Sequence, residues 1–323
     1  MILTVTLNTA LDITYRTPVL VPHATHRVSE VVERPGGKGL NVARVLSALG
    51  HRTVVTGFAG GRTGDVLREL LAQCGDGRTG PSRSSMTSST RPVDALVPIA
   101  GSTRRTIAVV DEATGDTTQL NEPGPTVSPA EWSAFLSVYD RLLTGADAVA
   151  LCGSLPPGIH VGAYAELIRR ARGAGVPVLL DTSGEPLRRG VAARPDLVKP
   201  NAEELARLTG SREPLRAARD ARRRGAHSVV ASLGADGVLA ATPDGIWQAT
   251  PPAPAKGNPT GAGDSAVAGL LSGLVERLPW PARLSRAVAL STATVLAPAA
   301  GEFDAGAYED LLPRIAVTEH QAA

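Results

Sequence analysis

The sequence of 323 residues predicts an α/β protein built around a mainly parallel sheet. Short apolar segments rich in β-branched residues alternate with segments of helical periodicity, which is typical of parallel strands covered by helices on both faces. Hydrophobic residues make up 43% of the chain and charged residues 20%, so a sizeable core can be buried. We expect residues 1–323 to form a single domain, because α/β proteins often reach this length undivided.

The first part of the chain predicts two strand and helix units. A buried strand is expected at residues 2–8, where ILTVTLN is apolar and β-branched. Residues 39–50 carry apolar side chains at helical spacing and end on a glycine, which favours a helix that stops there. A strand at 53–60 and a helix at 63–75 follow.

The second part of the chain continues the alternation. Ser128 and Glu131 form a capping-box pattern, and Pro129 suits the first helical position, so a helix is expected over 128–143. The remaining expected strands are 147–155, 176–184, 196–200 and 227–234, and the remaining expected helices are 162–175, 201–210 and one that begins near residue 261.

Two segments, at about 12–35 and 94–124, predict strands joined by turns without intervening helices. We expect them to form a small antiparallel sheet that lies over the main domain as a lid. Residues 75–92 are rich in glycine, serine and threonine and are expected to form a mobile loop.

The composition argues against several classes of protein. A net charge of +2, from 33 basic and 31 acidic residues, and an aromatic content of 3% do not favour a nucleic-acid-binding face. Cys74 and Cys152 are too few for a disulfide framework and form no CxxC pair for zinc. The N-terminal residues do not resemble a secretory leader, and no apolar run reaches the ~18 residues of a membrane span. A cytoplasmic protein with no membrane partner is therefore expected.

The stretch NPTGAGDS at residues 258–265 carries glycines and one acid where a helix begins. The first amide groups of a helix have no intrahelical partners and attract phosphate oxygens. Asp264 then has two interpretations. It is an acid that stabilises the first turn of the helix, or a base that accepts a proton from a hydroxyl attacking phosphorus. These eight residues alone leave both open.

Seven motifs together resemble the ribokinase-like sugar kinases. PGGKGLNVARVLSALG at 35–50 and NPTGAGDS at 258–265 are similar to the two signatures of that family. Five further motifs make the resemblance more specific, and they occur in the family's order: TLNTALD at 6–12, CGSLPPG at 152–158, LDTSG at 180–184, VKPNAEEL at 198–205 and SLGADG at 232–237. As a set they resemble the phosphofructokinase B branch, closest to the 1-phosphofructokinases and tagatose-6-phosphate kinases.

This resemblance implies a ribokinase-like three-layer α/β/α sandwich with a β-sheet lid that commonly mediates dimerisation, so a homodimer is expected. It also implies ATP and Mg²⁺ as cofactors and a small sugar phosphate as substrate, most simply fructose 1-phosphate converted to fructose 1,6-bisphosphate. The alternatives are tagatose 6-phosphate, fructose 6-phosphate or an unphosphorylated hexose as substrate, and a catalytically silent sugar-binding regulator. A dinucleotide-dependent oxidoreductase is disfavoured, because no GxGxxG turn follows the first expected strand.

The resemblance also assigns catalytic and substrate-binding roles. Asp264 is expected to be the catalytic base, with the amides of Gly261, Ala262 and Gly263 as the anion hole. The expected substrate-binding residues are Asp12, Gly36, Gly37, Lys38, Asn41, Arg105 and Ser154. Lys38 and Arg105 are expected to hold the phosphate already on the substrate. Arg104 would replace Arg105 if the strand slipped by one residue.

The nucleotide and metal assignments come from the same resemblance. The expected nucleotide-binding residues are Lys199, Asn201, Ser232, Gly234, Gly237, Thr260 and Gly263. Asn201 and Glu204 are expected to organise Mg²⁺ through water, although the pair also matches a helix-capping box. Gly234 and Gly237 also suit a simple hairpin turn. Cys152 stands where the family usually has a small hydroxyl residue, and we expect a buried apolar role for it.

Overall fold

The computed structural model describes residues 1–74, 91–297 and 301–320. Within these ranges eleven strands form the main sheet, in the order β15-β14-β13-β12-β11-β10-β9-β1-β4-β5, with β6 paired to β4. The parallel strands are β1 (Ile2–Thr6), β4 (Thr53–Ala59), β5 (Val93–Asp94), β6 (Val97–Pro98), β9 (Ala148–Cys152), β10 (Val178–Asp181), β11 (Leu197–Val198) and β12 (Ser228–Ser232). The antiparallel strands β13 (Val238–Ala241), β14 (Ile246–Thr250) and β15 (Ala316–His320) extend one edge. The expected mainly parallel sheet is confirmed.

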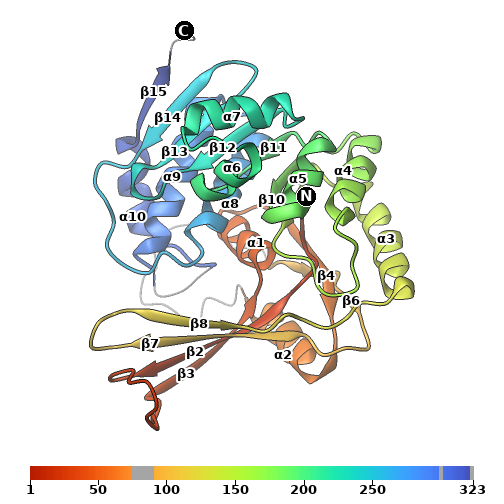
Figure 1. Cartoon of the computed structure of the whole chain (residues 1–323), viewed down its shortest axis with the longest axis vertical. Coiled ribbons are helices and arrows are strands. Elements are labelled where there is room, and N and C mark those ends of the chain that lie inside the picture. The colour runs from red at the N-terminus through yellow and green to blue at the C-terminus, as the bar shows by residue number, and fades with distance from the viewer. Residues whose placement is uncertain (75–90, 298–300, 321–323) are drawn as a thin grey trace.

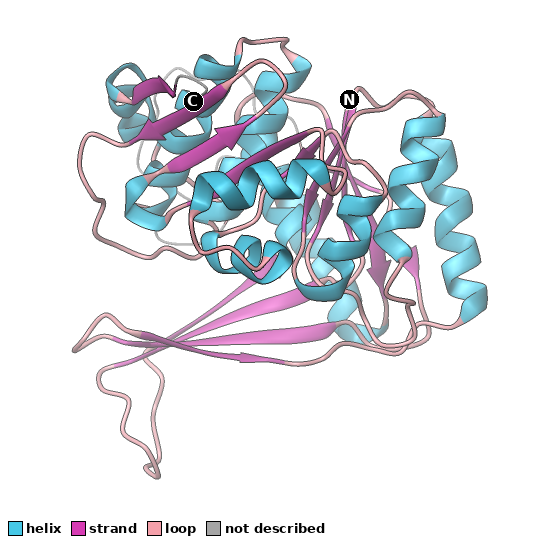
Figure 2. Ribbon diagram, turned by 45° about the horizontal axis from the view of Figure 1, so that its top comes forward, coloured by secondary structure: helices cyan, strands magenta, loops and turns pink. Residues whose placement is uncertain are grey.

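Helices cover both faces of this sheet (Figures 1 and 2). One face carries α3 (Pro129–Leu143), α4 (Ala163–Gly173), α5 (Gly184–Ala192), α6 (Ala202–Thr209) and α7 (Pro214–Arg223). The other carries α1 (Lys38–Ala48), α8 (Ala262–Val275), α9 (Trp280–Val295) and α10 (Ala305–Leu311). Helix α2 (Gly61–Gln73) packs with α1 and β4 through a third apolar cluster.

Strand β1 shows how the sequence builds the two cores. Alternate side chains of a strand point to opposite faces. Leu3 and Val5 accordingly pack in the cluster with α3 to α7, whereas Ile2 packs in the cluster with α1 and α8. All five residues of β1 are buried, including Thr4 and Thr6, as expected for a central strand that is covered on both faces.

Four strands form a second sheet that crosses below the main domain in Figure 1. They are β2 (Ala10–Thr17), β3 (Glu30–Gly36), β7 (Arg104–Asp111) and β8 (Thr117–Asn121), in the order β3-β2-β7-β8. The expectation of an antiparallel lid was wrong for the central pair, since β2 and β7 run parallel. Both strands leave the same end of the main sheet, β2 after β1 and β7 after β6, so they point the same way.

The boundary of the second lid segment also differs from the expectation. Residues 93–94 and 97–98 pair with β4 in the main sheet, so the lid strand begins only at Arg104. Most of the loop expected at 75–92 lies outside the described residues. Among the helices that the structure describes, none combines the length and apolar character needed to cross a bilayer.

Local signals located some elements and missed others. The capping box of Ser128 and Glu131 is formed, with Pro129 in the first turn of α3. Helix α7 was not predicted, because its buried face consists of alanines, which give a weak apolar pattern. The elements α5, α9, α10, β14 and β15 were not predicted either, whereas the hairpin turn expected at Gly234 and Gly237 implied β13.

Candidate active site

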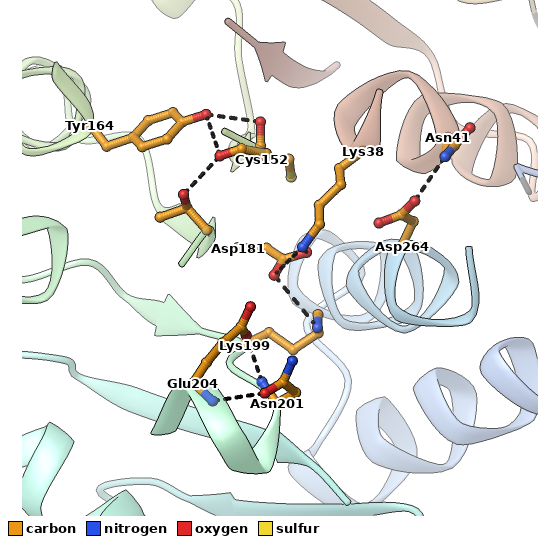
Figure 3. Close-up of polar contacts among 11 residues, drawn as sticks. Lys38, Asn41, Cys152, Tyr164, Asp181, Lys199, Asn201, Glu204 and Asp264 are labelled. Carbon is orange, nitrogen blue, oxygen red and sulfur yellow. Dashed lines mark hydrogen bonds and ion pairs between the residues drawn. The ribbon is translucent and has the colours of Figure 1, made fainter. Parts of the chain in front are cut away.

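Polar side chains from four parts of the chain meet at the carboxyl ends of the central strands, where open α/β sheets bind ligands. Asp181 is the last residue of β10, and Lys38 is the first residue of α1. Asp264 lies in the first turn of α8. Lys199 directly follows β11. Figure 3 shows these side chains turned toward one another.

Asp264 is held by a residue far away in the sequence. Asn41 of α1 donates from Nδ2 to Asp264 Oδ2 at 2.8 Å, across 223 positions of the chain. Asp264 is only 6% exposed, and its Oδ1 accepts no hydrogen bond among the described residues. The carboxylate therefore bonds to a neighbouring helix and keeps one oxygen available, which favours the interpretation as a base over that of a helix-stabilising acid.

The backbone at the start of α8 suits an anion. Gly261 precedes the helix with a φ of 86°, in the left-handed region, and no side chain caps the first amides. A Cβ at Gly263 would lie 3.5 Å from Lys199 Nζ, so that ammonium sits beside the first turn. The Ala262 amide donates to the Pro259 carbonyl at 3.2 Å. The other first amides, the helix dipole and one lysine can together stabilise a phosphoryl group. The anion hole expected at Gly261, Ala262 and Gly263 remains a prediction that this geometry suits.

The environment of Asp264 raises its pKa to about 6. Burial is the main cause, because it disfavours the charged form. The charges of Lys38 and Lys199 oppose this effect, and that of Asp181 adds to it. A base works best when its pKa lies near the working pH, so this value suits proton abstraction from an alcohol.

The pH dependence of kcat/KM tests this assignment. Asp264 can accept a proton only when ionised, and that form is lost as pH falls through its pKa of about 6. Burial likewise raises the pKa of Asp12 to about 6, and Asp12 accepts hydrogen bonds fully only when ionised. We expect log(kcat/KM) to fall below about pH 6 with a slope near two, and near one in Asp12→Asn. A flat profile from about pH 5 to 7 would exclude both carboxylates.

Asp181 is the charged residue of the site to which the sequence analysis gave no role. Its carboxylate is 1% exposed and lies 3.3 Å from Lys38 Nζ and 3.6 Å from Lys199 Nζ. Burial alone would lower the pKa of Lys38, but the charges of Asp181 and Asp264 outweigh it and raise that pKa. The signal that could have found Asp181 is an acid at the end of the buried apolar strand VLLD.

Asp12 lies at the base of the lid, where Gly36 makes room for it. A Cβ at Gly36 would lie 2.1 Å from Asp12 Oδ1, and Gly37 has a φ of 113°. Asp12 faces Thr106 across the parallel pair of β2 and β7. Any side chain at Gly36 would therefore displace the carboxylate.

The expected role of Arg105 needs correction. Successive residues of a strand point to opposite faces, and the register of β2 and β7 places Arg104 on the same face as Asp12. The charge of Arg104 lowers the pKa of Asp12 and so opposes the effect of burial. Arg105 points to the other face, where it is exposed and pairs with the Glu122 carboxylate. The β7 register thus places Arg104, not Arg105, beside the candidate site.

Ser154 lies in the turn after β9, and hydrogen bonds to the two preceding residues, Cys152 and Gly153, fix this turn. Tyr164 donates its hydroxyl to the carbonyls of Cys152, at 2.9 Å, and Gly153, at 3.1 Å. Thr182 Oγ1 donates to the Gly153 carbonyl at 2.7 Å. Ser154 itself is exposed. Cys152 is 0% exposed and burial raises the pKa of its thiol, which agrees with the expected apolar role.

Asn201 and Glu204, which are expected to bind the nucleotide and the metal ion, lie close to Lys199 (Figure 3). Asn201 and Glu204 form the capping box of α6, Asn201 Oδ1 accepting from the Glu204 amide at 2.8 Å and Glu204 Oε2 from the Asn201 amide at 2.9 Å. Asn201 also forms a bridge to Ser232 at the end of β12. The two residues thus form the helix-capping box that the sequence also predicts, and their role in binding Mg²⁺ remains a prediction.

Three further residues that are expected to bind the nucleotide lie in turns. Gly234 and Gly237 have φ values of 65° and 83° in the turn between β12 and β13, as the hairpin alternative requires. The Thr260 amide donates to Asn258 Oδ1 at 3.0 Å just before α8. Among the described residues, no group of three His, Cys, Asp or Glu side chains could hold a metal ion by itself.

Comparisons with known proteins found a matching family model and similar proteins. A family model described as pfkB family carbohydrate kinase matches residues 5–75 and 89–305. A 1-phosphofructokinase of Rhodobacter capsulatus is 40% identical over 276 residues, which make up 84% of this chain and 82% of that protein.

Solved structures share the whole fold. Phosphofructokinase-2 from Escherichia coli in complex with fructose-6-phosphate has a TM-score of 0.84 at 29% identity, covering 97% of this chain and 98% of that one. A protein of Thermotoga maritima named as a possible 1-phosphofructokinase has a TM-score of 0.81 at 27% identity, covering 99% and 100%. The expected fold and family are confirmed.

Proposed function

Because this chain belongs to the pfkB family of carbohydrate kinases, we propose that it phosphorylates fructose 1-phosphate to fructose 1,6-bisphosphate. The family assigns the reaction class, phosphoryl transfer to an alcohol group of a carbohydrate, with ATP as donor. The choice of substrate is supported by the Rhodobacter capsulatus relative. The observation that carries the chemistry is the buried carboxylate of Asp264 at the start of α8, whose Oδ1 accepts no hydrogen bond from the residues that the structure describes.

The proposed reaction needs one proton transfer and one displacement. Asp264 Oδ1 takes the proton of the sugar hydroxyl, whose oxygen then attacks the terminal phosphorus of ATP. The bond between that phosphorus and the bridging oxygen of ADP breaks. The amides of Gly261 to Gly263 and the ammonium of Lys199 offset the charge on the transferring group.

The substrate is proposed to bind between the lid and α1. Asp12 and Asn41 can bond to sugar hydroxyls, and the backbone at Gly36 and Gly37 allows close approach. Arg104, with its planar fork of donors, is the arginine placed to hold the phosphate already on the sugar. Lys38 would contribute a second positive charge after exchanging Asp181 for a phosphate oxygen.

The residues present fit a magnesium ion that is held mainly by water and phosphate oxygens. Glu204 uses Oε2 in the capping box, while its Oε1 accepts no hydrogen bond among the described residues. Magnesium prefers one or two protein oxygens and keeps several waters. When bound, the ion would neutralise charge on the nucleotide phosphates, and Asn201 and Glu204 would orient its waters.

A substrate panel tests the proposal directly. ATP and Mg²⁺ are supplied with fructose 1-phosphate, fructose 6-phosphate, tagatose 6-phosphate and unphosphorylated hexoses, and ADP release is coupled to a spectrophotometric assay. We expect the highest kcat/KM with fructose 1-phosphate. A preference for another phosphorylated sugar would correct the substrate, and sugar binding without any turnover would favour the silent regulator. Because it consumes ATP, the enzyme is proposed to act in the cytoplasm.

We also propose that the chain forms a homodimer through its lid. The lid face opposite Asp12 exposes apolar side chains, among them Val31 at 52% and Leu120 at 58%. Tyr15 lies on the same face and is half-buried. A second copy would cover these side chains.

Charge on that lid face should weaken the dimer. In Val31→Lys/Leu120→Lys we expect the dimer dissociation constant to rise by at least about tenfold, since burying each side chain is worth about 1.5–3 kcal/mol. Sedimentation analysis over a concentration series measures it. Val161→Lys, at a residue 44% exposed on the main domain, is the control and should leave the dimer intact. An unchanged distribution in the lid variant would refute this interface.

A further inference from the structure

Asn8 joins three segments of the chain behind the site of the substrate phosphate. It lies in the turn between β1 and β2 and is 6% exposed. Its Nδ2 donates to the Pro123 carbonyl and to Ser154 Oγ, both at 3.1 Å. Pro123 follows the last lid strand, and Ser154 follows the central strand β9. One amide thus links the entry to the lid, the exit from it and the end of the main sheet.

The chemistry of these partners fixes the direction of each hydrogen bond. A carbonyl oxygen can only accept, so the atom facing Pro123 must be the amide nitrogen. The same nitrogen can only donate to Ser154 Oγ, which therefore accepts. The hydroxyl hydrogen of Ser154 remains available, and since Ser154 is exposed, an oxygen of a bound sugar phosphate can receive it.

The backbone of Asn8 holds the arginine beside the site. Arg104 Nε donates to the Asn8 carbonyl at 3.3 Å, and its Nη1 donates to the Glu122 carbonyl at 3.3 Å. Arg104 lines a groove of ≈ 540 Å³ together with Pro123 and Gly124. Asn8 therefore touches Arg104, which holds the substrate phosphate in the proposed function, and Ser154, one of the expected substrate-binding residues.

The backbone at Gly124 leaves room for the side-chain amide of Asn8, and the oxygen of that amide is unpaired, which costs stability. Gly124 has a φ of 99°, and a Cβ there would lie 2.3 Å from Asn8 Oδ1. That oxygen is buried and has no hydrogen-bond partner among the described residues. A buried, unpaired acceptor costs stability, so a residue kept for stability alone would be expected to satisfy both ends of its amide.

We propose that Asn8 is a positioning residue for sugar-phosphate recognition, which orients the Ser154 hydroxyl as a donor and fixes Arg104 at the groove. This inference rests on the proposed sugar-phosphate kinase activity and adds a specificity determinant to it. Asn8 does not touch the reacting atoms. Substitution of Asn8 weakens the binding of the sugar phosphate and leaves the binding of the nucleotide unchanged.

Asn8→Asp and Asn8→Ala test the role. The aspartate has the same size but no donor, so Ser154 must turn its hydrogen toward it. Both variants keep the backbone carbonyl that holds Arg104, so they test the contact with Ser154. We expect both variants to raise the KM for the accepted sugar phosphate by about 5- to 20-fold, with the KM for ATP within about twofold of normal. Tyr139→Phe removes one buried hydrogen bond far from the site, from Tyr139 to the Leu167 carbonyl, and should lower only the Tm. Asn8 variants that behave like Tyr139→Phe would overturn the proposal.

A double-mutant cycle distinguishes an effect of Asn8 that acts through Ser154 from a general loss of local stability. In a Ser154→Ala background, Asn8→Ala should raise the KM by less than half the factor it produces alone. Full additivity would contradict an action through Ser154. If the proposed function itself is wrong, the unmodified enzyme shows no sugar-phosphate turnover at all, whereas failure of this inference leaves the unmodified enzyme active and the variants equal to it.

Discussion

Asp264→Asn is expected to lower kcat by about 10²–10⁴-fold while the sugar phosphate still binds. The amide has nearly the shape of the carboxylate but cannot accept the proton of the attacking hydroxyl. Asn41 can still bond to it, because the oxygen at that position remains an acceptor. Single-turnover measurement of phosphoryl transfer and calorimetric titration with the sugar phosphate give the two quantities separately.

A second aspartate at a helix start provides the control. Asp304 caps α10 by accepting from the Ala307 amide at 2.9 Å, and asparagine caps helices equally well. Asp304→Asn should therefore leave kcat unchanged. Near-normal turnover in Asp264→Asn would mean that Asp264 also serves only its helix, and the proposed mechanism would have to be abandoned.

Arg104→Met is expected to raise the KM for the sugar phosphate by about 10- to 100-fold, because hydrogen bonds to charged groups are worth about 1.5–3 kcal/mol. Methionine keeps much of the apolar stem but loses the charged fork. The KM for an unphosphorylated hexose should rise far less, since this sugar has no phosphate for Arg104 to bind. Steady-state kinetics with both kinds of sugar measure the difference.

The neighbouring arginine gives a matched comparison for this variant. Arg105→Met removes the same charge one residue away, but from the opposite face of β7, where it pairs with Glu122. We expect the KM of Arg105→Met to stay within about threefold of normal, since an exposed ion pair contributes little. Equal losses in both variants would show that general positive charge, rather than the face occupied by Arg104, governs binding.

Much of the fold follows from short-range patterns in the sequence. Alternating apolar strands and helical segments predicted the parallel sheet, and Ser128 with Glu131 predicted the start of α3. These signals work because strand and helix periodicity and caps depend on residues only a few positions apart. Where the apolar stripe consists of alanines, as in α7, the signal was too weak.

The sequence by itself determined the family motifs, the candidate base Asp264 and the glycines around it. Only the tertiary structure decided that Arg104 rather than Arg105 faces Asp12, that Asp181 pairs with Lys38 across 143 positions, and that Asn8 bonds to Ser154 across 146. The reason is physical. The register between β2 and β7 and the order of strands in the sheet are set by the packing of the whole core, and a shift of one residue reverses every side chain of a strand.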